Sequence, residues 1–325
     1  MSKAISVSNL SKTYKIHKKE PGFRGTLKSF INRKYETVTA VKDVSFEINE
    51  GELIGFIGPN GAGKTTTLKC LSGLLYPSNG AVQVLGHTPF KRDTNFLKKI
   101  ALVMGQKNQL WWDLPPTETF LLNKEIYGIP DRRYKETLND LVELLDVKDV
   151  LNTQVRKLSL GQRMKCELIA ALLHSPKVLF LDEPTIGLDV VMQKKLRDFI
   201  KAYNTKYNAT IILTSHYMED VRQLCERVIV IDHGVILFDG KLDNLIKEHT
   251  QHKFITVLFE KDVTREALSK LGKIQEFEFP KAVISVKRTE VNKVTTELLK
   301  SFPVIDLNIE EPDIEDIIRE VFSKK

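Results

Sequence analysis

The chain has 325 residues, of which 42% are hydrophobic and 28% are charged, and its formal net charge is +7. These values are typical of a globular protein that is long enough for two domains. No apolar run approaches the roughly 18 residues that a membrane span needs, and the start, MSKAISVSNL, lacks the apolar core of a signal peptide. We therefore expect a soluble cytoplasmic protein rather than a membrane-spanning or secreted one.

The net charge and the cysteines exclude few classes of protein. The positive balance suits a nucleic acid and an anionic membrane surface equally well, so the sign of the charge does not choose between these partners. Cys70, Cys166 and Cys225 are far apart in the sequence and show no metal-ligand spacing. We therefore expect buried, reduced thiols.

The first segment predicts a strand followed by a basic helix. Ala4 to Val7 alternates in hydrophobicity like an edge strand, and Tyr14 follows as a lone aromatic, which is more often a packing residue than a platform for a base. From Lys15 to Tyr35, seven lysines and arginines accompany one acid. The apolar residues that recur there at helical spacing are Phe23, Leu27, Phe30 and Ile31. Such a helix lies at a lipid interface, docks on a partner or packs on its own domain, and the sequence favours none of these.

A glycine-rich loop from Gly58 to Thr66 reads GPNGAGKTT and matches the pattern G-x-x-x-x-G-K-[ST]. It follows an apolar strand, Leu53 to Ile57, and precedes a predicted helix, Thr66 to Leu75, which is the context that a phosphate-binding loop requires. Lys64 supplies a cation for the β- and γ-phosphates, and the Thr65 hydroxyl is an expected ligand of Mg²⁺. The residues expected to bind the nucleotide here are Gly58, Asn60, Gly61, Gly63, Lys64, Thr65 and Thr66.

Further elements are predicted on either side of this loop. The predicted strands are Val38 to Ile48, Ala81 to Leu85 and Lys99 to Met104, and the predicted helices are Thr117 to Tyr127 and Arg133 to Leu145. Gln106 comes just after the last of these strands, where a polar side chain is well placed for a site. Trp111 and Trp112 stand near a proline pair and form either a local core or an exposed docking surface, with burial as the default for tryptophan.

Two acids at the end of a buried strand point to the chemistry. Lys177 to Leu181 is an apolar run typical of a parallel strand buried on both faces, and it ends in Asp182 and Glu183. Open α/β sheets bind ligands at the carboxyl ends of such strands. Asp182 is therefore expected to hold Mg²⁺ through its waters, and Glu183 is the candidate base that orients an attacking water.

Two more segments belong to the same pattern. Leu158 to Gln162 precedes a predicted helix, Arg163 to His174, and supplies a serine that can cap it. Thr210 to Leu213 is a β-branched strand that ends beside His216, a side chain that can accept or donate a proton at neutral pH.

In this order the motifs resemble those of the ATP-binding subunit of an ABC transporter, over roughly Ala4 to Gly240. The resemblance implies an α/β P-loop NTPase of the ABC type, with a helical subdomain at about residues 107–160, that binds ATP and Mg²⁺ and hydrolyses ATP. It assigns Gln106 to Mg²⁺ and to catalysis, Glu183 to the role of base and His216 to the γ-phosphate. Tyr14 takes the place of the family's adenine-stacking aromatic.

The same resemblance implies a site shared between two subunits. The residues of one subunit expected at the nucleotide of the other are Ser159, Gly161, Gln162 and Asp189. Leu160 stands where the family usually has the first glycine of LSGGQ, so a side chain replaces a hydrogen at a backbone-to-phosphate contact. This departure bears on how closely two subunits can approach each other.

Two stretches resemble one subgroup of the family. The run from Gln106 to Pro130 is most similar to type-two exporter ATPases, and the basic stretch after Tyr14 is similar to an extra helix in polysaccharide and teichoic-acid exporter ATPases. The implied partners are separate integral-membrane permease subunits and a second ATPase subunit, either identical or a paralogue, with an anionic membrane surface for the basic helix. The protein is then expected to be peripheral on the cytoplasmic face of the cell membrane.

The composition shifts after Gly240, and we place a domain boundary at residues 249–250. The predicted strands beyond it are Phe254 to Phe259, Lys273 to Phe279 and Ala282 to Lys287, and the predicted helices are Thr264 to Leu271, Glu290 to Phe302 and Asp313 to Phe322. This order predicts a small α+β accessory domain over residues 250–325. No catalytic cluster is evident in its sequence.

The sequence thus predicts an ATPase that powers a membrane exporter. The alternative is a soluble ABC-type ATPase that acts on nucleic acid or ribosomes, which only the positive charge suggests. A single set of motifs and the lack of a long coiled-coil insert count against it, so nucleic acid is not an expected partner. A regulator that binds nucleotide without hydrolysing it is disfavoured, because Glu183 and His216 are both present.

The basic helix gives a first testable prediction. Reversing Arg24, Lys28, Arg33 and Lys34 to glutamate should leave basal ATP hydrolysis by the isolated subunit unchanged and lower permease-coupled hydrolysis. Each cation near an anionic surface contributes on the order of 1 kcal/mol at low salt, which biases docking without anchoring the protein. Both rates should be measured: loss of basal activity would indicate a helix packed on its own domain, and unchanged coupling would exclude a role at the membrane.

Overall fold

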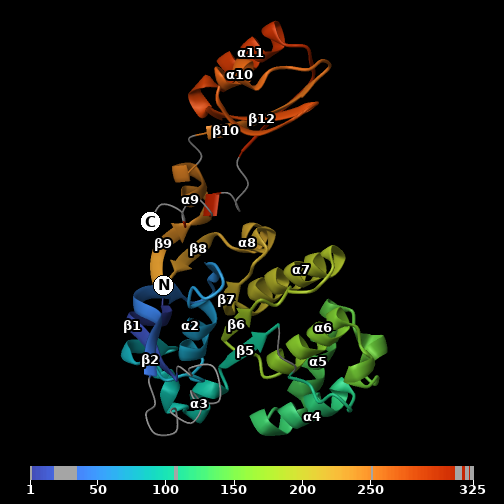
Figure 1. Ribbon diagram of the computed structural model, residues 1–325. Coiled ribbons are helices and arrows are strands. Elements are labelled where there is room, and N and C mark those ends of the chain that lie inside the picture. Colours follow the sequence, from blue (N-terminus) through green and yellow to red (C-terminus); the bar gives the residue numbers. More distant parts are fainter. Residues whose placement is uncertain are drawn as a thin grey trace, which may run out of the picture. The chain divides into compact units, whose positions relative to one another are not determined.

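The computed structural model describes residues 2–17, 35–105, 109–249, 252–311, 317, 318 and 322. The chain divides into two compact units, Met1–Gly240 and Lys241–Lys325 (Figure 1). The basic helix predicted around residues 23–34 and Gln106 lie outside the described residues, as does nearly all of the helix predicted over Asp313 to Phe322.

A six-stranded sheet forms the centre of the first unit, with the strand order β5-β6-β7-β3-β8-β9. Its strands are β3 (Leu53–Ile57), β5 (Ile100–Met104), β6 (Val178–Asp182), β7 (Thr210–Thr214), β8 (Arg227–Asp232) and β9 (Val235–Lys241). The first five of these pair in parallel. Every residue of β6 and β7 is buried, as the apolar sequence of these strands predicts.

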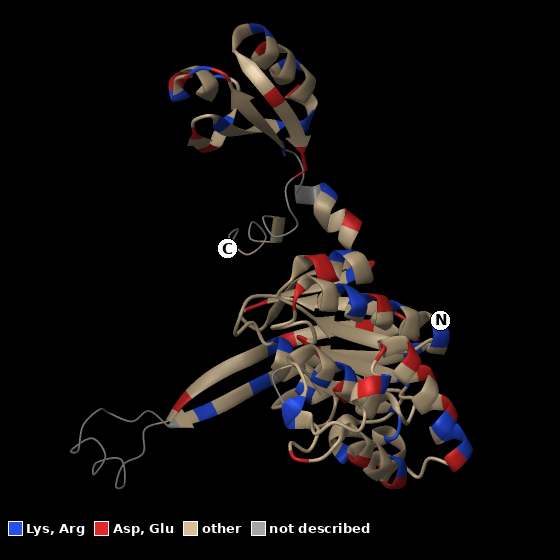
Figure 2. Ribbon diagram, turned by 90° about the vertical axis from the view of Figure 1, so that its right-hand side faces the viewer, with Lys and Arg blue, Asp and Glu red and all other residues tan. Residues whose placement is uncertain are grey.

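A three-stranded antiparallel sheet in the same unit has the order β2-β1-β4. Its strands are β1 (Lys3–His17), β2 (Tyr35–Asn49) and β4 (Asn79–Val84). The prediction of an edge strand near Val7 is wrong, because β1 pairs with both neighbours as far as Ser11. Tyr14 lies within β1 rather than after it, on a stretch that pairs only with β2, and Figure 2 shows these two strands projecting from the unit as a ribbon.

Helices surround the large sheet of the first unit (Figure 1). They are α2 (Lys64–Leu71), α3 (Thr94–Leu97), α4 (Pro116–Tyr127), α5 (Asp131–Leu145), α6 (Leu160–Leu172), α7 (Val190–Tyr207) and α8 (Met218–Leu224), with 3₁₀ turns η1 (Pro89–Lys91), η2 (Lys148–Val150) and η3 (Val155–Lys157). Helix α6 begins three residues before its predicted start, because Ser159 and Gln162 form a reciprocal capping box. Helix α2 likewise begins two residues early and ends four residues early.

The adjacent tryptophans correct another expectation. Trp111 is 58% exposed and Trp112 is 47% exposed, so the default of core burial is wrong for both. The buried apolar side chains of this stretch are Leu110 and Phe120. Backbone hydrogen bonds hold the tryptophan loop, since Arg156 N donates to Trp112 O over 3.0 Å. The exposed-surface alternative is the one that the structure supports.

The second unit is the predicted α+β domain with one further strand. It contains helix α9 (Leu242–His249), the strands β10 (His252–Phe259), β11 (Lys273–Glu278), β12 (Lys281–Lys287) and β13 (Val304–Glu310), the helices α10 (Arg265–Ser269) and α11 (Val291–Ser301), and the turn η4 (Arg288–Glu290). The strands form an antiparallel sheet in the order β11-β12-β10-β13. No strand was predicted for β13, although Ile305 to Glu310 alternates apolar and polar residues, which was the available signal. Within the described part of the chain, no helix is long and apolar enough to span a membrane.

A buried ion pair joins four elements of the first unit. The Asp220 carboxylate on α8 is fully buried and accepts hydrogen bonds from Arg197 Nη1 (2.7 Å), Ser215 Oγ (2.7 Å) and Thr185 Oγ1 (2.6 Å). Arg197 belongs to α7, Ser215 follows β7 and Thr185 lies in the loop after β6. The network therefore fixes both loops that follow these two strands.

This network predicts a large stability effect. Asp220→Ala should lower the free energy of unfolding by about 3–5 kcal/mol, because it leaves the Arg197 charge buried without its partner. Urea unfolding followed by tryptophan emission is a suitable measurement, since both tryptophans are in the first unit. Glu47→Ala is the control, because Glu47 pairs with Lys3 on the exposed surface and should contribute less than about 1 kcal/mol. Equal effects of the two substitutions would contradict the assignment.

Candidate functional site

The phosphate-binding loop between β3 and α2 requires glycine at three positions. A Cβ at Gly58 would lie 2.1 Å from Ile231 O, and one at Gly63 would lie 2.5 Å from Ala40 O, so neither position tolerates a side chain. Gly61 has φ +81° and faces open space, with no atom within 4 Å of an added Cβ. The loop is therefore packed tightly on its protein side and open at Gly61, where a ligand can approach the backbone.

The Lys64 side chain folds back onto the phosphate-binding loop. Its Nζ donates hydrogen bonds to Gly58 O (2.6 Å) and Pro59 O (3.1 Å), and the residue is only 5% exposed. Burial lowers the pKa of Lys64 below its usual value, and the carboxylates of Glu183 and Asp182 oppose part of that shift. Both acids are thus close enough to Lys64 to act on its charge.

Asp182 connects three elements at the carboxyl ends of their strands. Its Oδ2 accepts a hydrogen bond from Thr65 Oγ1 on α2 (2.8 Å), and its Oδ1 accepts one from Thr214 Oγ1 at the end of β7 (2.8 Å). Two of the three expected metal ligands, Thr65 and Asp182, are therefore in direct contact. Thr214 was not among the predicted site residues, although its place at a parallel strand's carboxyl end was the available signal.

Glu183 and His216 form a second pair beside the first. His216 Nε2 donates a hydrogen bond to Glu183 Oε1 over 2.7 Å, and the backbone N–H of Glu183 is held by Thr214 Oγ1 (3.0 Å) and Thr214 O (3.1 Å). Glu183 has a left-handed φ of +55°, which is strained for a residue with a side chain. A Cβ at Gly105 would lie 2.1 Å from Glu183 O, so only glycine fits at the end of β5.

These residues fit a magnesium nucleotide. The open side of Gly61 and the start of α2 at Lys64, whose N-cap makes no side-chain hydrogen bond, offer backbone donors to phosphate. The Thr65 hydroxyl and the Asp182 carboxylate supply the oxygen ligands that Mg²⁺ prefers. The donor set and the shape of the loop therefore both fit a magnesium nucleotide.

The segment Leu158–Gln162 lies elsewhere in the same unit. In Figure 1, α2 lies on one side of β6 and β7, and α6 lies on the other. Ser159 caps α6, and its Oγ accepts a hydrogen bond from Gln162 N over 3.2 Å. The segment Leu158–Gln162 lies next to the start of α7. There Asp189 is the N-cap, and its Oδ1 accepts a hydrogen bond from Met192 N over 2.8 Å.

Leu160 and Gly161 pack against this start of α7. A Cβ at Gly161 would lie 2.6 Å from Met192 Cε, and one at Gly187 would lie 2.9 Å from Leu160 Cδ2. The leucine side chain therefore turns towards Gly187 in its own chain. Ser159 itself is exposed.

Tyr14 is half-buried on the projecting ribbon, and Lys12 Nζ lies 5.4 Å from the centre of its ring. It pairs with Val38, two residues from Ala40, whose carbonyl oxygen abuts Gly63 of the phosphate-binding loop. The ribbon therefore runs beside the loop. Gln106 follows Gly105 in the sequence but lies outside the described residues.

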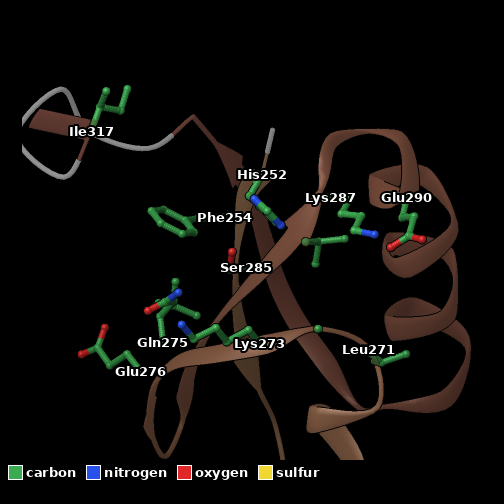
Figure 3. A pocket seen from close by; sticks show the side chains of 13 residues that line it. His252, Phe254, Leu271, Lys273, Gln275, Glu276, Ser285, Lys287, Glu290 and Ile317 are labelled. Atoms are coloured by element: carbon green, nitrogen blue, oxygen red, sulfur yellow. The ribbon is translucent and has the colours of Figure 1, made fainter. Parts of the chain in front are cut away.

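A cavity of about 800 Å³ lies in the second unit, and none of these residues lines it. Figure 3 shows Phe254, Lys273 and Gln275 among its lining residues, with Glu290 on another side. Its charged groups have both signs, namely Lys273, Lys287, Glu276 and Glu290. This mixture favours no single class of ligand, and we assign the cavity no role.

Comparison with known proteins agrees with the geometry. Residues 41–186 match the model of the ABC transporter family, and residues 251–310 match that of the EvrA-like ABC transporter C-terminal domain. The chain is 35% identical to the ABC transporter ATP-binding protein NatA of Bacillus subtilis over 212 residues, which are 65% of this chain and 86% of NatA.

Two further relatives are named for the transport of a particular compound. The bacitracin transport ATP-binding protein BcrA of Bacillus licheniformis is 31% identical over 68% of this chain and 71% of its own length. The methionine import ATP-binding protein MetN of Geobacillus kaustophilus is 32% identical over 84% of this chain and 81% of its own length. A solved ATP-binding cassette dimer bound to ADP and phosphate is similar in fold, with a TM-score of 0.61 and 24% identity over 73% of this chain and 98% of that chain.

The chain therefore belongs to the family of ABC transporter ATP-binding proteins. It is an α/β ATPase that binds ATP with Mg²⁺, hydrolyses ATP and energises membrane transport. Of the solved structures with a similar fold, one is a dimer and another is part of the ABC transporter complex cbiONQ. The comparisons give no support to the alternative of an ATPase that acts on nucleic acid or ribosomes.

One further titratable group contacts the described residues that follow Gln106 in the sequence. Glu167, on α6, is 2% exposed, and its Oε1 accepts a hydrogen bond from Gln109 N over 3.4 Å. Burial raises the pKa of Glu167 to about 7, while that hydrogen bond and the charge of Arg163 act in the opposite direction. The carboxyl group therefore changes its charge near neutral pH.

Glu167→Gln should make the protein more stable at pH 8. The raised pKa means that folding favours the protonated acid, so the stability that Glu167 contributes is full below its unfolded pKa and is lost as pH rises towards about 7. Glutamine avoids this loss and should gain about 1–3 kcal/mol at pH 8, with the gain shrinking as pH falls towards about 4.5. Thermal unfolding measured across this range tests the assignment, and a gain that does not depend on pH would contradict it.

Proposed function

We propose that two copies of this chain form a head-to-tail dimer that encloses two MgATP molecules and drives export through separate permease subunits. The observation that carries the proposal is the contact of Asp182 with Thr65 beside the pair Glu183–His216, at one edge of the sheet. The described residues expected to bind the phosphates and Mg²⁺ gather there, and the residues expected at the nucleotide of the other copy lie across the sheet on α6 and α7 (Figure 1).

The loop side of the site binds the phosphates. Backbone donors from Gly58 to Thr66 cradle the β- and γ-phosphates, and Lys64 gives up its contacts with the loop carbonyls to neutralise their charge. Mg²⁺ neutralises charge that develops on the phosphates, and Thr65, Asp182 and Gln106 are the residues that would hold it. Tyr14, on the neighbouring ribbon, stacks on the adenine.

Glu183 orients and deprotonates the attacking water. Its backbone, at φ +55°, is held by two hydrogen bonds from its N–H to Thr214, and its carboxylate is held by His216. His216 holds one carboxylate oxygen and, by its place at the end of β7, reaches the γ-phosphate when nucleotide is bound. The second carboxylate oxygen is then directed at the water.

The other side of each site comes from the second copy. Ser159, Gly161 and Gln162 lie on the first turn of α6 or cap it, where backbone N–H groups and the helix dipole favour a phosphate. Asp189 caps the adjacent helix and borders the same surface. The Leu160 side chain lies against Gly187 of its own chain rather than pointing outwards. A leucine in place of the usual glycine is therefore compatible with the contact between the two copies.

The part of the proposal that concerns the permease rests on the loop that contains Trp111 and Trp112. Trp111 and Trp112 are exposed, and α4 adds Leu121, Leu122 and Ile126 to the exposed apolar side chains of the helical subdomain. Exposed aromatic side chains of this kind are typical of docking surfaces. We propose that a permease docks here, which places the subunit at the cytoplasmic face of the membrane, and that the basic segment 15–35 adds contacts to permease or lipid.

Export rather than import is supported by sequence similarity. The run from Gln106 to Pro130 resembles type-two exporter ATPases, and BcrA is named for bacitracin transport. MetN is named for methionine import, so similarity of the cassette alone does not determine the direction. The accessory domain over residues 250–325 is proposed as a separate module of the same subunit.

Glu183→Gln tests the chemistry most directly. The variant should bind ATP with unchanged affinity and lose at least about 100-fold in turnover, because the amide cannot accept the proton of water. Nucleotide binding by calorimetry and phosphate release in the presence of Mg²⁺ measure the two quantities. Lys64→Ala is the matched comparison, and it should weaken binding itself because it deletes the phosphate cation. Near-normal turnover of Glu183→Gln would exclude Glu183 as the base.

A further inference from the structure

The antiparallel sheet of the second unit has two unlike edges. One edge is β11, whose apolar side chains Ile274 and Phe277 are half-buried against the core of this unit. The exposed residues of β11 are mostly charged, and its pairing with β12 is interrupted in the middle, between Ile274 and Glu276. A charged and interrupted edge is protected against pairing with another chain.

The other edge, β13, lacks this protection. Among the described residues it pairs with β10 alone, and its single register irregularity falls at its start, between Val304 and Asp306. The strand contains no lysine, arginine or proline. Two of its apolar side chains are exposed, Ile305 by 66% and Ile309 by 39%. An exposed apolar edge of this kind is a template for a further strand.

The apolar side chains of β13 share one face of the strand. Leu307 pairs with Val257 and Ile309 pairs with Ile255, and both partners are buried in the core of the second unit. By alternation along the strand, Ile305 belongs to the same face, and the three polar residues that follow it belong to the other. A strand that joined this edge would therefore match it best with apolar side chains at the same spacing.

The sequence of β13 is complementary to itself in this respect. In an antiparallel pair with a two-fold axis at Leu307, Ile305 of one copy lies opposite Ile309 of the other, and Asp306 lies opposite Asn308. No like charges then face each other. Moving the axis by one residue in either direction places Asp306 opposite an acid of the other copy, which is unfavourable.

The polar groups along this edge can accommodate the second strand. Leu307 N donates to Asp306 Oδ1 over 2.8 Å, and Asn308 Nδ2 donates to Glu310 Oε1 over 2.6 Å. The amide of Asn308 has two N–H groups, so it can keep Glu310 and also donate to Asp306 of the other copy. The Leu307 N–H that Asp306 then releases is available to the backbone of the other strand.

We propose that two copies of this chain associate through β13, so that their second units share one continuous antiparallel sheet centred on Leu307. The partner at this edge is a second copy of the chain. The pairing involves no nucleotide, so it persists after ATP is hydrolysed and keeps the two first units at a high local concentration. It thus goes beyond the proposed function, in which the interface between the copies encloses nucleotide.

Sedimentation of the full chain without nucleotide or Mg²⁺ tests for this dimer. The unsubstituted chain should be a dimer at micromolar concentration, and the double variant Ile305→Lys/Ile309→Lys should be a monomer, because lysines on an edge strand oppose pairing. Both side chains are exposed, so the fold should persist, as circular dichroism can verify. Leu299→Lys is the control and should remain a dimer, since Leu299 is 58% exposed on α11 of the same unit.

Three results of this measurement would overturn the inference. They are a monomeric unsubstituted chain, a double variant that dimerises as well as the unsubstituted chain, and loss of the dimer in Leu299→Lys.

Cysteine cross-linking tests the register. A residue on the two-fold axis lies opposite its own counterpart, so Leu307→Cys should give a disulfide-linked dimer on mild oxidation. The three native cysteines are buried and should not contribute. Ile274→Cys is the matched control, because Ile274 is also a half-buried aliphatic residue on an edge strand, and it should give no covalent dimer.

If Leu307→Cys does not fold, a mixture of Asp306→Cys and Asn308→Cys gives the same test, because both residues are exposed and lie opposite each other in the proposed pair. A cross-linked dimer from Leu307→Cys or from this mixture, and not from Ile274→Cys, supports the pairing. No covalent dimer from the folded variants, or equal amounts from Leu307→Cys and Ile274→Cys, would contradict it.

Discussion

The arrangement of the nucleotide site depends on one carboxylate. Asp182 accepts hydrogen bonds from Thr65 and Thr214, and in this way it joins the helix after the phosphate-binding loop to the ends of β6 and β7. The parallel pairing of β3, β6 and β7 brings these positions to the same edge of the sheet. The buried pair Asp220–Arg197 then fixes the loops after β6 and β7, which carry Glu183 and His216 towards that edge.

A single chain holds the two kinds of nucleotide contact apart. Helix α2, which follows the phosphate-binding loop, lies on one side of β6 and β7, while α6 lies on the other (Figure 1). The contacts of Leu160 and Gly161 with the start of α7 keep the second group together as one surface. Two such surfaces, one per chain, complete two sites if the chains associate head to tail.

The sequence predicted those features that short motifs encode. Gly58 and Lys64 belong to one strand–loop–helix motif, and Asp182 and Glu183 follow from one buried strand, so each pair is recognisable from its local sequence. The pairing of β3, β6 and β7 then brings the two pairs together. Thr214, Asp220 and the left-handed φ of Glu183 were not predicted, because they depend on which strands become neighbours in the sheet. Burial of the tryptophans was predicted from residue type and failed, since hydrogen bonds of the loop backbone hold both rings outside.

The central claim, that each nucleotide is bound between two copies of the chain, is tested most directly by complementation. Ser159→Arg blocks the surface on α6, and Lys64→Ala disables the phosphate loop, so each variant alone should be inactive. A mixture should form dimers in which one of the two sites has both halves intact, and ATP hydrolysis should return to part of the normal rate. A mixture no more active than either variant alone would contradict the head-to-tail arrangement.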